Sequence, residues 1–332
     1  MANGDLNPAI AGPHKRQLRN YSVSGNGSWG HRMTVHVVRG AILTSAVLGT
    51  IYVKTLQWYM DALWQWLLTT WVYNSVYFET WFVTVCYAIL TAFPLAMDHI
   101  AWFDCYKIHP SVRYTHTTIL SMLVDAIIYD TPLMLLDTFK IKRYAGVDSG
   151  LLEERERYWI QTTRALPREA PAVGQFVWQL AASILAFDAA FFLIHYGFHR
   201  NSLLYKYIHR HHHKHDVIYC HVTNQLTIPE RLALILSANE ALKIFSSHPL
   251  TRTAFVPVFI WMLIDNHSGY DVPWGAQHVI PFGLYGGPVK HYYHHEHGGR
   301  YYQPFFSYFD KLLLKEPNNN NDLKDLWSRK DH

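Results

Sequence analysis

The chain is poor in charge. Only 16% of its 332 residues are charged, whereas soluble domains usually carry about 25%. The net charge of +4 is small, and no basic stripe or recognition motif accompanies it, so we expect no nucleic-acid partner. The shortage of charge indicates that much of the surface does not face water.

Several kinds of catalytic machinery are also missing. The three cysteines, Cys86, Cys105 and Cys220, have no paired spacing, which argues against a disulfide framework and a thiolate metal site. The sequence has no Gly-x-Ser-x-Gly nucleophile elbow and no haem-binding module. Its Gly-x-Gly-x-x-Gly pattern, Gly25–Gly30, follows no predicted strand and so is not a dinucleotide-binding fingerprint. The sequence therefore favours neither a nicotinamide- or flavin-binding enzyme nor a serine hydrolase.

Long apolar stretches replace the missing charge. Each approaches the roughly 20 residues that cross a bilayer, and tryptophans and tyrosines near their ends suit the headgroup region. The alternative is a set of buried helices in a large soluble protein. We predict an all-α, multi-span integral membrane bundle, with spans at Val35–Val53, Phe78–Met97, Ile119–Leu136 and Gln175–Ile194. Thr55–Tyr73 either spans the membrane or lies in its interface.

The pattern divides the chain into five parts. Basic residues before the first span predict that the N-terminal tail stays in the cytoplasm. The predicted parts are a flexible polar tail (1–34), transmembrane helices (35–137), a charged connector (138–174), a catalytic domain (175–315) and a second polar tail (316–332).

Histidine is abundant in the predicted catalytic domain. Fifteen of the 22 histidines lie between His195 and His297. They form the clusters HYGFH (195–199), HRHHH (209–213) and HYYHH (291–295), with His267 between the last two. Residues three and four apart share a helix face, and imidazole is a common ligand of iron, copper and zinc. So many ligands exceed the needs of one metal ion and suit two ions in one site at the end of a span.

The order and spacing of these clusters resemble the three histidine boxes of the fatty acid hydroxylase/sterol desaturase superfamily of membrane di-iron enzymes. The boxes read H-x-x-x-H, H-x-x-H-H and H-x-x-H-H. The segments YKIHP (106–110), HPLT (248–251), HSGYD (267–271) and PFGLYGG (281–287) resemble the cholesterol 25-hydroxylase branch in particular. The resemblance covers about residues 106–314.

The resemblance implies a ligand set. By position, the iron ligands are His195, His199, His209, His212, His213, His267, His291, His294 and His295. Many methylsterol oxidases carry His-Pro-x-Glu after box two, but this chain has Thr227-Ile228-Pro229-Glu230, without the histidine. A water, His221 or His278 is then the candidate for the last ligand. Asp188, Asp271 and Glu230 are candidates for carboxylates that orient the ligands.

The function implied is O₂-dependent hydroxylation of a lipophilic, sterol- or terpenoid-like substrate by a non-haem di-iron monooxygenase. Zinc is expected in some purified samples. Electrons are expected from cytochrome b5 or a reductase that uses NAD(P)H. The protein is expected to be a multi-pass protein of the endoplasmic-reticulum membrane, with the metal site at the cytosolic surface. The alternatives are a desaturase or methyl oxidase with the same site, a membrane metal-binding or transport protein, and a metal-dependent lipid hydrolase.

Overall fold

The computed structural model describes residues 29–109, 119–215 and 217–314. Over these residues the chain is helical, with isolated β-bridges and no β-strand. The α-helices are α1 (Trp29–Ile51), α2 (Val53–Thr69), α3 (Trp71–Asn74), α4 (Phe78–Asp98), α5 (Ile119–Phe139), α6 (Ser149–Glu156), α7 (Val173–Arg200), α8 (Ser202–Leu204), α9 (Ile228–Ile244), α10 (Pro249–Asn266), α11 (Ala276–Val279), α12 (Gly287–His297) and α13 (Tyr308–Leu314). The predicted all-α class is confirmed.

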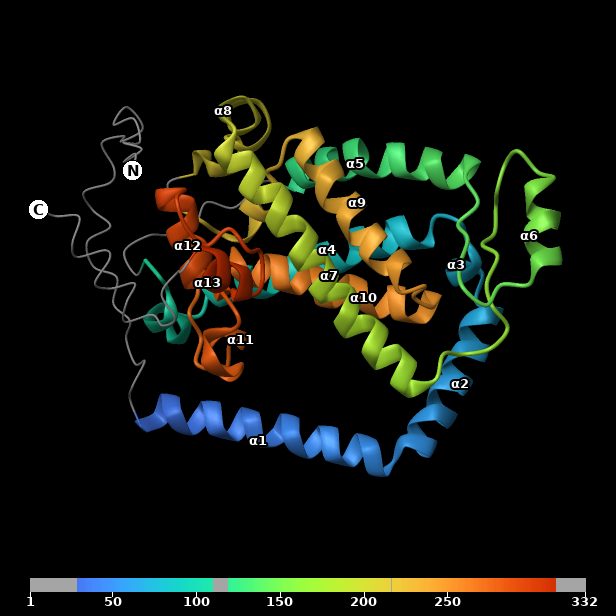
Figure 1. Ribbon diagram of the computed structural model, residues 1–332, viewed down its shortest axis with the longest axis horizontal. Coiled ribbons are helices and arrows are strands. Elements are labelled where there is room, and N and C mark those ends of the chain that lie inside the picture. Colours follow the sequence, from blue (N-terminus) through green and yellow to red (C-terminus); the bar gives the residue numbers. More distant parts are fainter. Residues whose placement is uncertain (1–28, 110–118, 216, 315–332) are drawn as a thin grey trace, which may run out of the picture.

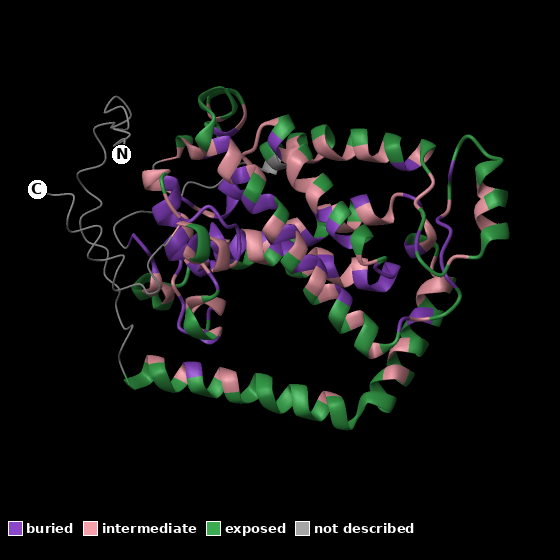
Figure 2. Ribbon diagram, in the orientation of Figure 1, coloured by how far each residue is buried: buried purple, intermediate pink, exposed green. Residues whose placement is uncertain are grey.

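The long helices form an elongated bundle (Figure 1). Helix α7 packs on α9, and α10 packs on both α4 and α7. Aromatic side chains fill the centre, where the ring of Phe187 meets that of Phe259 edge to face at 4.6 Å. Helices α12 and α13 lie at one end of the bundle, whereas α3 and α6 lie at the other (Figure 1). Buried residues follow the contacts of α7 and α10 and gather around α12 (Figure 2).

Helix starts follow from local sequence. Thr227 caps α9 by accepting the backbone N–H of Glu230, and Pro229 occupies the first turn. His248 caps α10 by accepting the N–H of Leu250. A polar acceptor followed by proline is a common helix start, because proline lacks the N–H that would otherwise need a partner there.

Three described helices, α1, α4 and α7, are long and apolar enough to cross a membrane. Their outward faces remain apolar; on α1, for example, Leu43 is 67% exposed and Val47 is 56% exposed. Long helices with such surfaces are stable in lipid, because their backbone groups are paired internally. The chain is a membrane protein. The fourth predicted span, Ile119–Leu136, forms most of α5, and its crossing stays a prediction.

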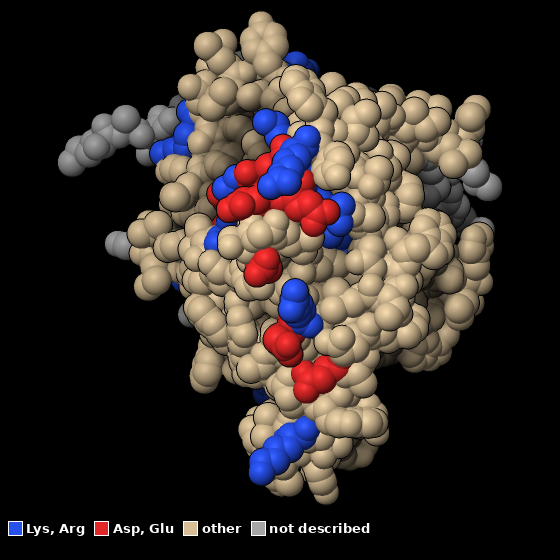
Figure 3. All heavy atoms as spheres, turned by 90° about the vertical axis from the view of Figure 1, so that its right-hand side faces the viewer, with Lys and Arg blue, Asp and Glu red and all other residues tan. Residues whose placement is uncertain are grey.

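Two predicted boundaries differ from the structure. The predicted tail 1–34 overlaps α1, which begins at Trp29. The stretch Thr55–Tyr73, predicted either to span the membrane or to lie in its interface, divides into α2 and α3. The connector 138–174 contains the short α6, at the end of the bundle where positive and negative side chains gather on an otherwise uncharged face (Figure 3).

Candidate metal centre

The first two histidines lie at the C-terminal end of α7. His195 and His199 are one turn apart, so both imidazoles leave the same face of the helix. The prediction that a long apolar helix runs directly into the histidine cluster is confirmed.

Box two does not lie on a regular helix. Instead, Tyr205–His209 forms a π-helical turn and His212–Lys214 a turn of 3₁₀-helix. The wider π turn is closed by the bond from the N–H of Arg210 to the carbonyl of Tyr205. The change of pitch separates the directions of neighbouring histidines.

Box three is held by α12. The helix starts after Gly286, and Gly287 adopts a left-handed φ of 71°. A Cβ atom at Gly287 would lie 2.7 Å from Cβ of Gln277, so glycine is required by both the backbone conformation and the space. Gly298 ends the helix in the left-handed conformation.

The structure brings all nine predicted ligands together in two groups. In each group the ligand nitrogens lie within 4.8 Å of one another. Group one comprises His195, His199, His209, His213 and His294, and group two comprises His212, His267, His291 and His295. The expectation that each box points toward one place needs correction. Within boxes two and three, residues four apart share a group, whereas the remaining histidine joins the other group.

The Nε2 atoms converge within each group. In group one, Nε2 of His209 lies 3.0 Å from that of His195 and 2.9 Å from those of His199 and His213. In group two, Nε2 of His291 lies 3.0 Å from that of His267 and 3.1 Å from that of His295.

Partners of Nδ1 decide which nitrogen carries the proton. Nδ1 of His195 lies 2.6 Å from the carbonyl oxygen of Tyr302, and Nδ1 of His294 lies 2.6 Å from that of Arg300. Nδ1 of His267 lies 2.8 Å from the carbonyl oxygen of Leu263. A carbonyl only accepts, so these rings donate from Nδ1 and present a lone pair at Nε2.

Facing lone pairs at such separations repel one another unless a cation lies between them. Metal–nitrogen bonds of about 2.1 Å at right angles place neighbouring nitrogens about 3.0 Å apart, as the Nε2 atoms are here. The donor set therefore fits metal ions in both groups. That these nine residues bind metal stays a prediction.

Burial keeps the imidazoles neutral. It lowers the pKa of His267 to about 4. Burial, reinforced by neighbouring rings, holds the pKa values of His212, His291 and His295 well below the ordinary value. Neutral imidazole is the form that binds metal, so these groups are ready to bind at neutral pH.

Glu230 is the one candidate carboxylate that touches a predicted ligand. Its Oε1 lies 2.6 Å from Nδ1 of His209, and both side chains are at most 2% exposed. Burial raises the pKa of Glu230 to about 9. A cation bound at Nε2 of His209 would oppose this shift, because nearby positive charge favours the carboxylate.

The other candidates lie elsewhere. Oδ1 of Asp271 is 2.7 Å from Nε2 of His278, and the two form a pair outside both groups. His221 also belongs to neither group. Asp188 bonds to the backbone of Phe305 and Phe306 rather than to a histidine ring.

Sequence reasoning missed the acceptors for His195 and His294. Both are backbone carbonyls of the segment 300–306, which Asp310 holds from α13 by accepting the N–H groups of Tyr302 and Gln303. A backbone acceptor leaves no residue-type signal in a sequence.

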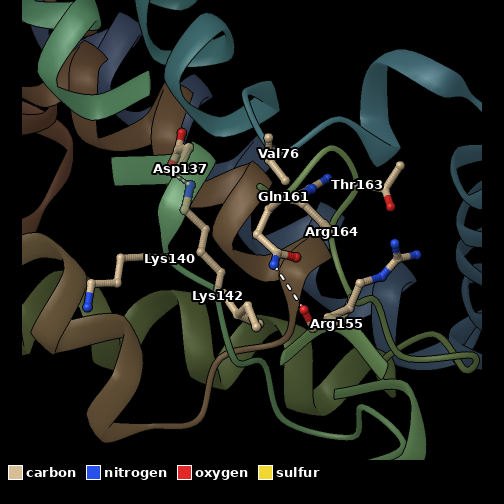
Figure 4. A pocket seen from close by; sticks show the side chains of 10 residues that line it. Val76, Asp137, Lys140, Lys142, Arg155, Gln161, Thr163 and Arg164 are labelled. Atoms are coloured by element: carbon tan, nitrogen blue, oxygen red, sulfur yellow. Dashed lines mark hydrogen bonds and ion pairs between the residues drawn. The ribbon is translucent and has the colours of Figure 1, made fainter. Parts of the chain in front are cut away.

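A small cavity lies far from the histidines. Figure 4 shows its lining, which includes Asp137, Lys142, Gln161 and Arg164 beside the charged connector. It has space for about one water molecule. It is too small for a lipid.

Comparison with known proteins places this geometry in a family. Residues 180–314 match the family model described as Fatty acid hydroxylase. This segment therefore resembles a fatty acid hydroxylase domain. The resemblance predicted from the histidine boxes is confirmed, and both histidine groups lie within the domain.

Relatives of the fatty acid hydroxylase domain are sterol enzymes by name. Cholesterol 25-hydroxylase of Rattus norvegicus is 34% identical over 134 residues, which are 40% of this chain and 45% of that protein. Cholesterol 25-hydroxylase-like protein of Danio rerio is 35% identical over 134 residues, 40% of this chain and 53% of that protein. These matches span about half the length of the relatives.

A longer match extends beyond the domain. Methylsterol monooxygenase 1-3 of Arabidopsis thaliana is 27% identical over 239 residues, 68% of this chain and 75% of that protein. No solved structure matches the chain.

Proposed function

We propose that the protein is a non-haem di-iron monooxygenase that hydroxylates a lipophilic, sterol- or terpenoid-like substrate with O₂. The observation that carries the proposal is the pair of adjacent histidine groups, whose lone pairs converge at the end of apolar helices. The names of the cholesterol 25-hydroxylase relatives support oxidation of a sterol-like molecule.

The protein's own residues hold and orient the metal ions. His195, His199, His209, His213 and His294 hold one ion, and His212, His267, His291 and His295 hold the other. Backbone carbonyls and Glu230 fix the ring orientations. The rings of His213 and His295 stack at 4.4 Å, which places the two groups side by side.

When bound, the iron ions supply the redox chemistry that splits O₂, a reaction beyond the reach of any amino-acid side chain. The overall reaction consumes one C–H bond, O₂, two electrons and two protons, and yields one C–OH group and water. The two electrons come from an external donor, for which cytochrome b5 or an NAD(P)H-dependent reductase is the proposed source.

The bilayer supplies the substrate. A sterol dissolves among the lipid chains that contact the exposed apolar faces of α1, α4 and α7. A site at the end of α7 lies at the membrane surface, where such a molecule is reached without passing through water. We propose a multi-pass endoplasmic-reticulum location with this end in the cytosol.

Oxidation of a sterol methyl group is the second candidate. The match to methylsterol monooxygenase 1-3 covers 75% of that protein, more than the cholesterol 25-hydroxylase matches cover of theirs. Both reactions insert oxygen from O₂, so the product alone distinguishes them.

Isotope labelling tests the proposal. Membranes that contain the protein are supplied with an electron donor and sterols, first under labelled O₂ and then in labelled water. The expected product gains one labelled oxygen atom from O₂ and none from water. Label from water alone would indicate hydrolysis or hydration, and loss of two hydrogens without oxygen gain would indicate a desaturase. Metal uptake with no change in any lipid would favour a metal carrier.

A further inference from the structure

The segment Arg300–Phe306 passes beside group one without forming a helix or a strand. Its carbonyl groups at Arg300 and Tyr302 accept hydrogen bonds from Nδ1 of His294 and His195, each at 2.6 Å. Two of the five rings of group one therefore take their orientation from this segment.

The segment does not hold its own shape. Tyr301 has a left-handed φ of 56°, which is uncommon for a residue with a bulky side chain and costs about 1 kcal/mol or more. No regular backbone ladder offsets this cost. Contacts from other elements must hold it.

Asp310 on α13 holds the first half of the segment. One carboxylate oxygen accepts the N–H of Tyr302 at 2.9 Å, and the other accepts the N–H of Gln303 at 3.0 Å. Asp310 is 1% exposed. Each oxygen faces a backbone donor, so an amide in its place would put one N–H group against another.

Asp188 on α7 holds the second half. Its Oδ1 accepts the N–H of Phe305 at 2.7 Å and that of Phe306 at 3.2 Å, and its Oδ2 accepts from the side chain of Gln303. Asp188 is fully buried, two turns before His195 on the same helix. The helix that carries His195 thus also fixes the backbone that orients it.

One neighbour of a group two ligand contacts this segment: the side chain of Asn266, next to His267, donates to the carbonyl of Pro304. The ring of His267 itself is oriented elsewhere. Nδ1 of His267 bonds to the carbonyl of Leu263 within α10. Among the described residues, no hydrogen bond joins a histidine of group two to residues 300–306. The rings of His195 and His294 on one side and of His267 on the other therefore take their orientation from different backbone acceptors.

We propose that Asp310 and Asp188 are positioning residues for the metal ion of group one alone, acting through segment 300–306. This inference rests on the proposed function, because it requires that both groups bind metal. It predicts that loss of either carboxylate weakens one metal position and spares the other.

The experiment measures iron bound per chain. Detergent-purified protein is loaded with Fe²⁺ without oxygen and titrated with a chelator, for the wild type, Asp310→Asn, Asp188→Asn and the control Asp137→Asn. Asp137 is a buried carboxylate (6% exposed) at the opposite end of the bundle, paired with Lys142. The wild type and the control should release both iron ions over the same range of chelator concentration. The two test variants should release one ion at a chelator concentration about 10- to 100-fold lower, as loss of supporting contacts typically does.

Double variants identify the affected position. Asp310→Asn combined with His212→Ala should weaken both positions, because His212 belongs to group two. Asp310→Asn combined with His294→Ala should retain the same single ion as His294→Ala alone. A residue that only stabilises the fold would weaken both positions equally in every background.

The outcomes separate the inference from the function. Two ions bound with wild-type affinity in both folded test variants overturn the inference, as does equal weakening of both positions. If Asp310→Asn elutes as aggregate, Asp188→Asn decides by the same criteria. A wild-type protein that binds fewer than two ions refutes the di-iron proposal itself.

Discussion

His212 and His213 are neighbours in the chain, yet their imidazoles belong to different groups. The ring planes lie at 89° to each other, with centroids 5.8 Å apart. His213 turns toward His209, whereas His212 turns toward His267. One short segment thus supplies both groups, so a distortion of box two should disturb both metal positions.

Removal of one ligand from either group should stop turnover without unfolding the protein. His212→Ala and His294→Ala should each lower activity by at least about 100-fold, since loss of a residue that only orients a metal ligand already costs about 10- to 100-fold. Both should remain inserted in the membrane, because insertion depends on the apolar helices. Activity on sterols and resistance to carbonate extraction measure the two effects.

The control for the ligand variants is His14→Ala. His14 lies outside the described residues, in the predicted N-terminal tail. The activity of the His14→Ala variant should equal that of the wild type. Equal loss in all three variants would refute a special role for the histidine groups.

Glu230 should support iron binding through His209. Glu230→Ala leaves Nδ1 of His209 without its buried acceptor, so iron affinity should fall by about 10- to 100-fold. Glu230→Gln keeps an acceptor oxygen and should lose less. Glu240→Ala is the matched control, because Glu240 lies on the same helix in an exposed ion pair with Lys243. Iron affinity should decrease in the order wild type, Glu230→Gln, Glu230→Ala. Any other order would contradict the role of Glu230 as the acceptor for His209.

Acid should weaken the cap of α10. Burial lowers the pKa of His248 to about 4, from about 6.5 in the unfolded chain. Because the folded pKa is the lower one, its stabilising contribution is complete above pH 6.5 and is lost as the pH falls toward 4, at up to about 1.4 kcal/mol per pH unit. Protonation also removes the lone pair that accepts the N–H of Leu250.

The variant His248→Asn tests this pH dependence. Asparagine caps helices well but does not titrate in this range. Thermal unfolding midpoints in detergent between pH 4 and 6.5 should therefore fall less steeply for the variant than for the wild type. Identical slopes would show that His248 does not contribute.

Glu79 should stabilise the end of the bundle far from the histidines. Its carboxylate lies 3.3 Å from both Nε of Arg252 and Nζ of Lys142, and 3.5 Å from Nη1 of Arg164. Glu79→Gln leaves Arg252 and Arg164 without their counter-charge, whereas Lys142 keeps Asp137, and unfolding should become easier by about 3 kcal/mol. The exposed pair of Arg143 and Glu156 supplies the control; Glu156→Gln should cost less than about 1 kcal/mol. Denaturant titration compares the two, and iron content per folded chain should stay unchanged in both.

Periodicity and residue type were enough to predict much of this protein. The stretch Phe78–Met97 matches α4 to within one residue, and Gln175–Ile194 lies within the longer α7, because a long apolar segment satisfies its backbone only as a helix. The box spacing singled out eight of the nine histidines that converge, and the family resemblance added His267. The boundary of α1 was less well predicted, because Trp29–Thr34 lacks a clear start signal.

Local sequence could not predict how the histidines divide. Spacing places His209, His212 and His213 on one helical face, yet His212 joins the second group, whose other members come from the end of α10 and from α12. Asp188 and Asp271 were candidates for carboxylates that orient the ligands, because both lie near predicted ligands in the sequence. Yet Asp188 holds a backbone segment and Asp271 pairs with His278.

The sequence by itself determined the helical class, the apolar spans and the residues able to bind metal, because these depend on composition and short-range periodicity. Only the tertiary structure decided which histidines share a group, which nitrogen of each ring faces inward, and that segment 300–306 orients His195 and His294. Those features depend on contacts between residues about 100 positions apart, such as Nδ1 of His195 with the carbonyl of Tyr302. Such contacts form only when α7, α12 and α13 pack together. Because every residue has a backbone carbonyl, no pattern of side chains predicts which carbonyl accepts the hydrogen bond.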